Sequence, residues 1–190
     1  MAIVVVGGSS RKVGKTSVVA GLIAAMPQMR WTAIKVTPHW HGEPYAEPVA
    51  VSEETDPNAG TDSARFLAAG ALRSLWVSVG PGDLAEAMPR IRKEMERAEN
   101  TIFESNSILE FLQPDLYLTV IGGRADDFKE SAELYLESAD AVLAPEDLLR
   151  NPPWQGISLK LAKGTSVLPM RPPVYVTEEV KRFVRERICR

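Results

Sequence analysis

The chain has 190 residues, enough for one domain with a sizeable core, and its 45% hydrophobic content argues against a disordered chain. Acidic and basic residues nearly cancel, at 25 against 22, so no electrostatic footprint for nucleic acid or a membrane surface stands out. The single cysteine excludes an intramolecular disulfide, and no apolar run approaches the ~20 residues of a membrane span. The N-terminus lacks the positive region of a signal peptide, so we expect a cytoplasmic protein acting on a small molecule or a protein partner.

The first unit of the chain reads as strand, loop and helix. A β-rich run over Ile3 to Gly7 leads into a short Gly/Ser/basic loop, and a helix is predicted from about Lys15 to Met26. A second strand over Trp31 to Thr37 follows a very short connection. This alternation predicts βαβ units around a mostly parallel sheet.

The loop after the first strand carries a phosphate-binding motif, GKT at Gly14, Lys15 and Thr16. In such a loop the backbone N–H groups surround the phosphates, the lysine neutralises their oxygens, and the hydroxyl binds Mg²⁺. The full pattern has a glycine where this chain has Ser9, a small residue that still permits the turn. We therefore predict that a nucleotide contacts the loop residues Gly8, Ser9, Ser10, Arg11, Lys12, Val13, Gly14, Lys15, Thr16 and Ser17.

The rest of the chain continues the α/β alternation. Residues 38–60 hold four prolines without periodicity and predict a long, mobile loop, and Thr61 or Asp62 then caps a helix. Further strands are predicted at 72–79, 101–105, 115–121, 141–145 and within 172–176, with helices at 83–99, 129–139 and before residue 188. No linker separates a second domain, so residues 1–190 form a single nucleotide-binding domain.

Ligands of parallel sheets lie beyond the carboxyl ends of the strands, so polar residues at those ends are candidates. Lys35 lies within an apolar strand and needs an anion, which a phosphate or a substrate carboxylate would supply. His39 and His41, with Glu43, follow this strand and could bind either a transition metal or substrate.

Two carboxylates are candidates for the magnesium site. Glu104 ends a buried strand, at the place where nucleotide hydrolases hold Mg²⁺ through a carboxylate. Asp62 starts the helix after the long loop, where it serves either as an N-cap or as a second metal ligand. Together with the hydroxyl of Thr16 they form the predicted metal set, and Lys15 and Lys35 are the predicted catalytic residues.

These segments resemble the MobB-like P-loop NTPases of molybdopterin-guanine dinucleotide biosynthesis, and more distantly the dethiobiotin synthetases. The resemblance covers most of the chain and rests on GKT, on IKVTPHWHG at 34–42, on GTDSARFLAAGA at 60–71 and on Glu104. It departs from the family at Ser105, where a glycine is usual, and at the paired histidines, of which His39 is the counterpart.

The resemblance implies a three-layer P-loop fold and a weak, Mg²⁺-dependent GTPase that assists molybdenum-cofactor maturation, with GTP favoured over ATP. It implies a molybdopterin-type cofactor or a cofactor-biosynthesis protein as partner, and it is compatible with a homodimer. In that family the second-strand lysine, here Lys35, faces the nucleotide or substrate, and Asp62 and Glu104 approach Mg²⁺. Two alternatives stay open: an ATP-dependent small-molecule kinase or ligase, and a nucleotide-switched metallochaperone or interaction module using His39 and His41.

Overall fold

The computed structural model describes residues 1–37, 49–80, 82–122, 129–150 and 165–189. Their strands are β1 Ile3–Gly8, β2 Trp31–Thr37, β3 Val49–Glu54, β4 Arg73–Val79, β5 Asn100–Glu104, β6 Leu116–Val120, β7 Ala141–Pro145 and β8 Ser166–Met170. The helices are α1 Lys15–Ala25, α2 Asp62–Ala68, α3 Leu84–Glu96, α4 Glu130–Leu136, α5 Glu146–Arg150 and α6 Glu178–Ile188, with short 3₁₀ turns η1 Pro27–Met29 and η2 Ser107–Glu110.

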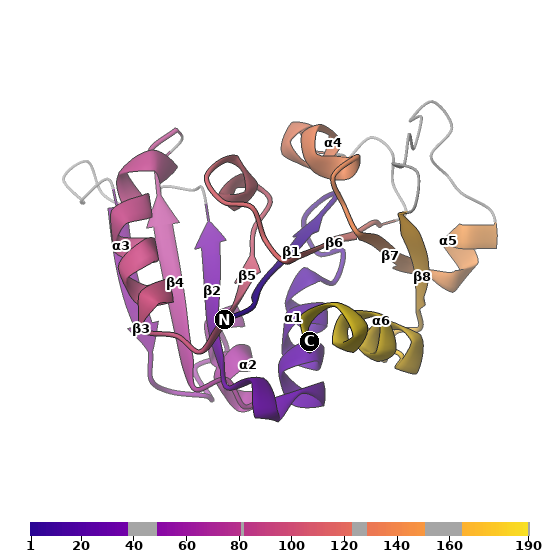
Figure 1. Ribbon diagram of the computed structural model, residues 1–190, viewed down its shortest axis with the longest axis horizontal. Coiled ribbons are helices and arrows are strands. Elements are labelled where there is room, and N and C mark those ends of the chain that lie inside the picture. Colours follow the sequence, from indigo (N-terminus) through magenta and orange to yellow (C-terminus); the bar gives the residue numbers. More distant parts are fainter. Residues whose placement is uncertain (38–48, 81, 123–128, 151–164, 190) are drawn as a thin grey trace.

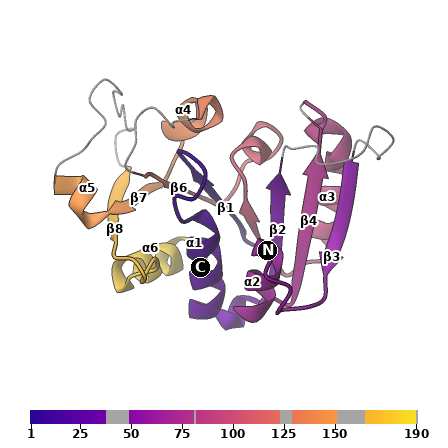
Figure 2. The same cartoon turned by 180° about the vertical axis from the view of Figure 1, so that it is seen from behind.

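The strands of the described residues form one sheet in the order β3-β4-β2-β5-β1-β6-β7-β8. All neighbours are parallel except β3 and β4, which are antiparallel. Helices cover both faces, with α1, α2 and α6 on one side and α3 on the other (Figures 1 and 2). The predicted α/β three-layer fold with a mostly parallel central sheet is therefore confirmed.

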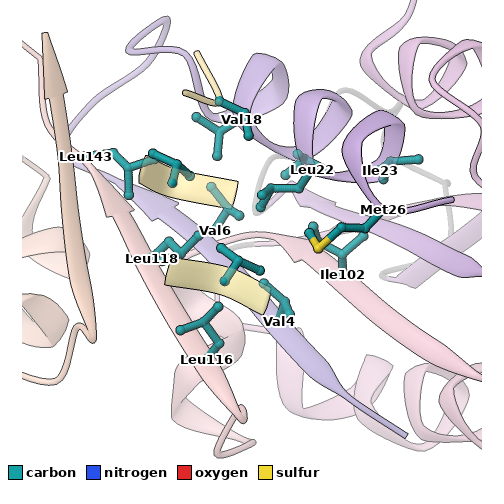
Figure 3. Close-up of a cluster of buried hydrophobic side chains, with 14 of the residues drawn as sticks. Val4, Val6, Val18, Leu22, Ile23, Met26, Ile102, Leu116, Leu118 and Leu143 are labelled. Carbon is teal, nitrogen blue, oxygen red and sulfur yellow. The ribbon is translucent and has the colours of Figure 1, made fainter. Parts of the chain in front are cut away.

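The central strand β1 is buried on both faces, which explains its unbroken run of valines. Val4 and Val6 point into the core beneath α1, whereas Val5 lies in the core on the α3 side. Figure 3 shows Val6 below Val18 and Leu22 of α1, and Val4 farther along the strand near Met26 and Ile102. Each fully buried valine or leucine stabilises the fold by about 1.5–3 kcal/mol, so this packing fixes α1, and the loop before it, against the sheet.

The structure corrects the prediction of a loop over 38–60, because Val49–Glu54 form the edge strand β3. This segment has only Val49 and Val51 as alternating apolar residues, too few to predict a strand. Pairing with β4 supplies the missing stability, including two contacts of Arg73 with Glu53 at 2.7 and 2.8 Å. Residues 38–48 of the predicted loop, with His39, His41 and Glu43, lie outside the described residues.

The last strand is also displaced from its predicted place. It was expected within 172–176 but lies at Ser166–Met170, where it pairs with β7. Pro172 and Pro173 have no backbone N–H and cannot donate to a strand ladder. Pro169 is tolerated within β8 because this strand lies at the edge of the sheet.

Candidate nucleotide-binding site

The GKT motif lies where the chain passes from β1 into α1, at the carboxyl edge of the sheet (Figure 1). Gly14 directly precedes α1 with a φ of 109°, a left-handed conformation that favours glycine. A Cβ at this position would also lie 2.4 Å from a ring carbon of Tyr175. No side chain of the described residues caps the first turn of α1, so its N–H groups are available to an anion.

Ser9, the departure from the full motif, is buried and has a defined structural role. Its hydroxyl accepts a hydrogen bond from Gly122 N at 3.0 Å, and its own N–H donates to Val120 O at 2.8 Å. Its carbonyl accepts from Lys129 N, also at 2.8 Å. Ser9 therefore attaches the loop to the end of β6 and to the residue that precedes α4.

Asn106 holds the other side of the loop, a role that no motif or spacing in the sequence predicts. Its side-chain Oδ1 accepts from Gly8 N at 2.7 Å, and its Nδ2 donates to Gly8 O at 3.0 Å. A Cβ at Gly7 would lie 2.3 Å from the same Oδ1, so only glycine leaves space for this side chain. The two bonds hold the start of the loop to the segment that follows β5.

The Lys15 side chain turns back over the loop, where its Nζ donates to Ser10 O at 2.7 Å. Burial lowers the pKa of Lys15 to about 8, an effect that Glu104 opposes and that Lys129 and Lys35 reinforce. A bound phosphate group would stabilise the charged ammonium and raise its pKa again. Lys15 lines the cleft beside the loop, and its role as an anion ligand stays a prediction.

Thr16 and Glu104 come together from segments 88 residues apart in the sequence. Thr16 Oγ1 donates to Glu104 Oε2 at 2.8 Å, and Glu104 is only 5% exposed. The parallel pairing of β1 with β5 places Glu104 opposite Val6, just before the loop begins. The structure thus brings two members of the predicted metal set together, and their binding of Mg²⁺ stays a prediction.

Lys35 lies between the two predicted metal-binding carboxylates. It is opposite Glu104 in the pairing of β2 with β5, and its Nζ contacts Glu104 Oε1 at 3.3 Å and also the Asp62 carboxylate. The negative charges beside Lys35 therefore come from the side chains of Asp62 and Glu104. Thr61 caps α2 by accepting from Ala64 N at 3.0 Å, which leaves the Asp62 side chain to face Lys35.

These groups line a cleft of about 530 Å³. Its walls include Arg11, Lys12, Gly14, Lys15, Thr16, Ser17, Lys35, Asp62, Arg65, Glu104, Ser105, Asn106, Ser107, Lys129, Ser131 and Tyr175. The remaining loop residues for which nucleotide contacts were predicted, Gly8, Ser9, Ser10 and Val13, are not among the residues that line the cleft. Arg65, Lys129 and Tyr175 are not among the predicted site residues; Arg65 lies within the GTDSARFLAAGA segment, whereas Lys129 and Tyr175 come from separate parts of the chain and belong to no recognisable motif.

The oxygen donors of Thr16, Asp62 and Glu104 suit a hard cation, and Mg²⁺ takes few protein ligands because phosphate and water complete its shell. Within the described residues no group of three or more His, Cys, Asp or Glu side chains is placed to hold a metal. The donor set therefore fits Mg²⁺ bound together with a nucleotide better than a transition metal held by the protein alone.

The sheet order, the helices on both faces and the loop between β1 and α1 define the fold of the P-loop NTPases. HypB from Helicobacter pylori, solved in complex with nickel, shares it with a TM-score of 0.55 and 16% identity over 96% of this chain and 85% of that chain. LpxK from Aquifex aeolicus, solved with ATP, gives a TM-score of 0.49 and 16% identity over 88% of this chain and 53% of that chain. No protein-family model and no curated protein matches the sequence. None of the helices in the described part of the chain has the length and apolar character to cross a bilayer.

Proposed function

We propose that this protein binds a nucleoside triphosphate with Mg²⁺ in the cleft and hydrolyses it slowly. The observation that carries the proposal is the contact of Thr16 with Glu104 beside the open N-terminus of α1. It joins the three features that such a site needs: backbone donors, a lysine and an oxygen-ligand set.

The predicted catalytic and metal-binding residues each have a role in this proposal. The N–H groups around Gly14 and the ammonium of Lys15 receive the β- and γ-phosphates and stabilise the charge that develops on them. Thr16 would hold Mg²⁺ directly, with Glu104 and Asp62 bound to it directly or through water. The metal, when bound, neutralises phosphate charge. Lys35 positions both carboxylates and lies within reach of phosphate or substrate in the same cleft.

Slow turnover follows from the partners of the two carboxylates. Glu104 accepts from Thr16 and contacts Lys35, and Asp62 contacts Lys35 and lies 3.8 Å from Arg65. Each is therefore already engaged, and neither serves as a general base toward an attacking water.

The biological setting that we propose comes from the family resemblance. GTP is the favoured nucleotide, and maturation of the molybdenum cofactor is the favoured process, with a molybdopterin-type cofactor or a biosynthetic protein as partner. A kinase or ligase of small molecules is the second candidate, and the extent of the cleft lining favours it, since the lining includes Arg65 and Lys129 outside the loop.

Calorimetry with GTP and with ATP, each with and without Mg²⁺, tests the proposal. We expect binding of at least one nucleotide that strengthens with Mg²⁺ and is lost in Lys15→Ala. Folded protein that binds neither nucleotide at millimolar concentration would overturn the proposal. Nucleotide hydrolysis that one metabolite switches on would favour the kinase or ligase over the GTPase.

A further inference from the structure

A single ammonium group, that of Lys35, contacts both carboxylates of the proposed magnesium site. Its Nζ lies 3.3 Å from Glu104 Oε1, and it also contacts Asp62 Oδ2. Glu104 comes from the end of β5 and Asp62 from the first residue of α2, so the ammonium links two separate elements. The Lys35 side chain is 19% exposed and Glu104 is buried, so water screens these charges less than it would at the surface.

The oxygen atoms of the two carboxylates already face donors of this chain. Glu104 Oε2 accepts from Thr16 Oγ1 at 2.8 Å, and Glu104 Oε1 faces Lys35. Asp62 Oδ2 contacts Lys35, and Asp62 Oδ1 lies 3.8 Å from Arg65 Nη1. Mg²⁺ binds carboxylate oxygens at about 2.0–2.1 Å or through a water ligand. A divalent cation shared by both carboxylates would therefore lie against the Lys35 ammonium and be repelled by it.

The Lys35 ammonium can leave the carboxylates only by turning its side chain. The pairing of β2 with β5 fixes the Lys35 backbone directly opposite Glu104. The lysine stem, in contrast, is a flexible chain of four carbons. Lys35 and Lys15 line the same cleft, so a triphosphate bound at the loop offers the Lys35 ammonium another anion.

We propose that in the nucleotide-free protein the Lys35 ammonium takes the place of the divalent cation between Asp62 and Glu104, so that Mg²⁺ binds only together with a nucleotide. The inference rests on the proposed function and specifies how its metal site is regulated. When a triphosphate binds the loop, the Lys35 side chain turns toward it, and both carboxylates become available to Mg²⁺ or to its water ligands. The buried carboxylate of Glu104 then has a cationic partner in both states, which avoids the cost of an unpaired buried charge.

Titration of the nucleotide-free protein with Mn²⁺ tests this inference. Mn²⁺ shares the preference of Mg²⁺ for carboxylate and water ligands, and electron paramagnetic resonance measures the unbound ion. We expect the wild type to bind Mn²⁺ weakly and Lys35→Met, which keeps a similar length without the charge, to bind one Mn²⁺ about tenfold more tightly or better. Lys35→Arg keeps a cation beside the carboxylates, so its Mn²⁺ affinity should stay within about threefold of the wild type.

Two further variants locate the bound metal and control for charge. The double variant Lys35→Met with Glu104→Gln lacks one of the two carboxylates and should lose the gain in Mn²⁺ affinity. Lys93→Met is the matched control, because Lys93 is exposed on α3 and does not line the cleft. Its Mn²⁺ affinity should equal that of the wild type within about twofold. Circular dichroism checks that each variant is folded, and Lys35→Gln replaces Lys35→Met in the test if the latter does not fold.

Three outcomes would overturn the inference. The first is nucleotide-free wild type that binds one Mn²⁺ as tightly as Lys35→Met does. The second is an equal gain in Lys35→Met and Lys93→Met, which would reduce the effect to overall charge. The third is a gain that survives in the double variant with Glu104→Gln, which would place the metal elsewhere. All three leave the proposed function intact, because these titrations contain no nucleotide. Failure of the wild type to bind GTP or ATP would instead contradict the proposed function itself.

Discussion

Thr16 Oγ1 and Glu104 Oε2 are 2.8 Å apart, although the two residues lie in the first helix and the fifth strand. The contact exists because β5 is the parallel neighbour of β1 and ends level with the start of the phosphate loop. A carboxylate that accepts from the GKT hydroxyl needs little movement to share a cation with it. The order of the strands in the sheet therefore places these two proposed Mg²⁺ ligands side by side.

Glu104→Gln tests that link. Glutamine has the same shape and still accepts a hydrogen bond from Thr16, but it lacks the charge that attracts Mg²⁺. We expect nucleotide binding to persist in this variant while the gain in affinity on adding Mg²⁺ falls by about tenfold. Calorimetry with and without Mg²⁺ measures that gain.

Glu96→Gln, an exposed change on α3, is the control and should leave the Mg²⁺ effect unchanged. If Glu104→Gln kept the full Mg²⁺ effect, Glu104 would be a structural partner of Thr16 and Lys35 only.

Much of this site could be predicted, because its members stand at recognisable points of a regular pattern. Lys15 and Thr16 follow a strand and open a helix, and Glu104 ends a buried strand. Parallel strands bring such ends to one edge of the sheet whatever the details of packing. The fold class followed from the same alternation of strands and helices.

The parts that could not be predicted depend on tertiary contacts. The β3 segment is a strand because β4 pairs with it, and its own apolar pattern is weak. Asn106 and Lys129 acquire their roles only when the chain brings them against Gly8 and Ser9. The sequence analysis likewise expects an external phosphate or carboxylate beside the Lys35 ammonium. In the structure the ammonium contacts the carboxylates of Asp62 and Glu104.

Lys15→Ala should sharply weaken nucleotide binding without destabilising the ligand-free protein. A lysine whose pKa falls from 10.5 to about 8 on folding opposes folding at neutral pH, by on the order of 3 kcal/mol. Its position at the first residue of α1, near the positive end of the helix dipole, is also unfavourable. We therefore expect urea denaturation at pH 7 to give an equal or higher free energy of unfolding for the variant. A marked loss of ligand-free stability would mean that Lys15 serves the loop structure.

The same pKa predicts how nucleotide binding depends on pH. Below about pH 8 Lys15 is already charged in the free protein, so binding does not change its protonation. Above it the free lysine is largely neutral, and a bound phosphate raises its pKa, so binding takes up a proton and affinity falls by up to tenfold per pH unit. Calorimetry at pH 8.5 in two buffers of different ionisation enthalpy measures this uptake. Lys15→Arg keeps its charge throughout, and any uptake that it retains would have to come from another group.

Asn106→Ala should loosen the phosphate loop. It removes both side-chain hydrogen bonds to Gly8, one at 2.7 Å and one at 3.0 Å. The Gly8 N–H and C=O groups must then form hydrogen bonds with water. We expect a loss of about 1–3 kcal/mol in the free energy of unfolding and a weaker affinity for nucleotide. Asn106→Asp replaces the donor to Gly8 O with a charged oxygen and adds a negative charge to the cleft, so its nucleotide affinity should fall at least as far as that of the alanine variant. If both variants bound nucleotide like the wild type, the loop would keep its shape without this side chain.

Ser9→Gly restores the full phosphate-loop pattern, yet we expect it to lower the stability of the folded protein. Glycine lacks the buried hydroxyl that accepts from Gly122 N at 3.0 Å, and it adds backbone freedom to the unfolded chain. The free energy of unfolding should fall by about 1–2 kcal/mol, and Ser9→Ala, which keeps the Cβ, should lose less. Because the serine side chain points toward Gly122 and does not line the cleft, nucleotide affinity should change by less than about threefold in both variants. Urea denaturation and calorimetry measure the two quantities separately. Tighter nucleotide binding by Ser9→Gly would show instead that the serine obstructs the loop and that its bond to Gly122 is secondary.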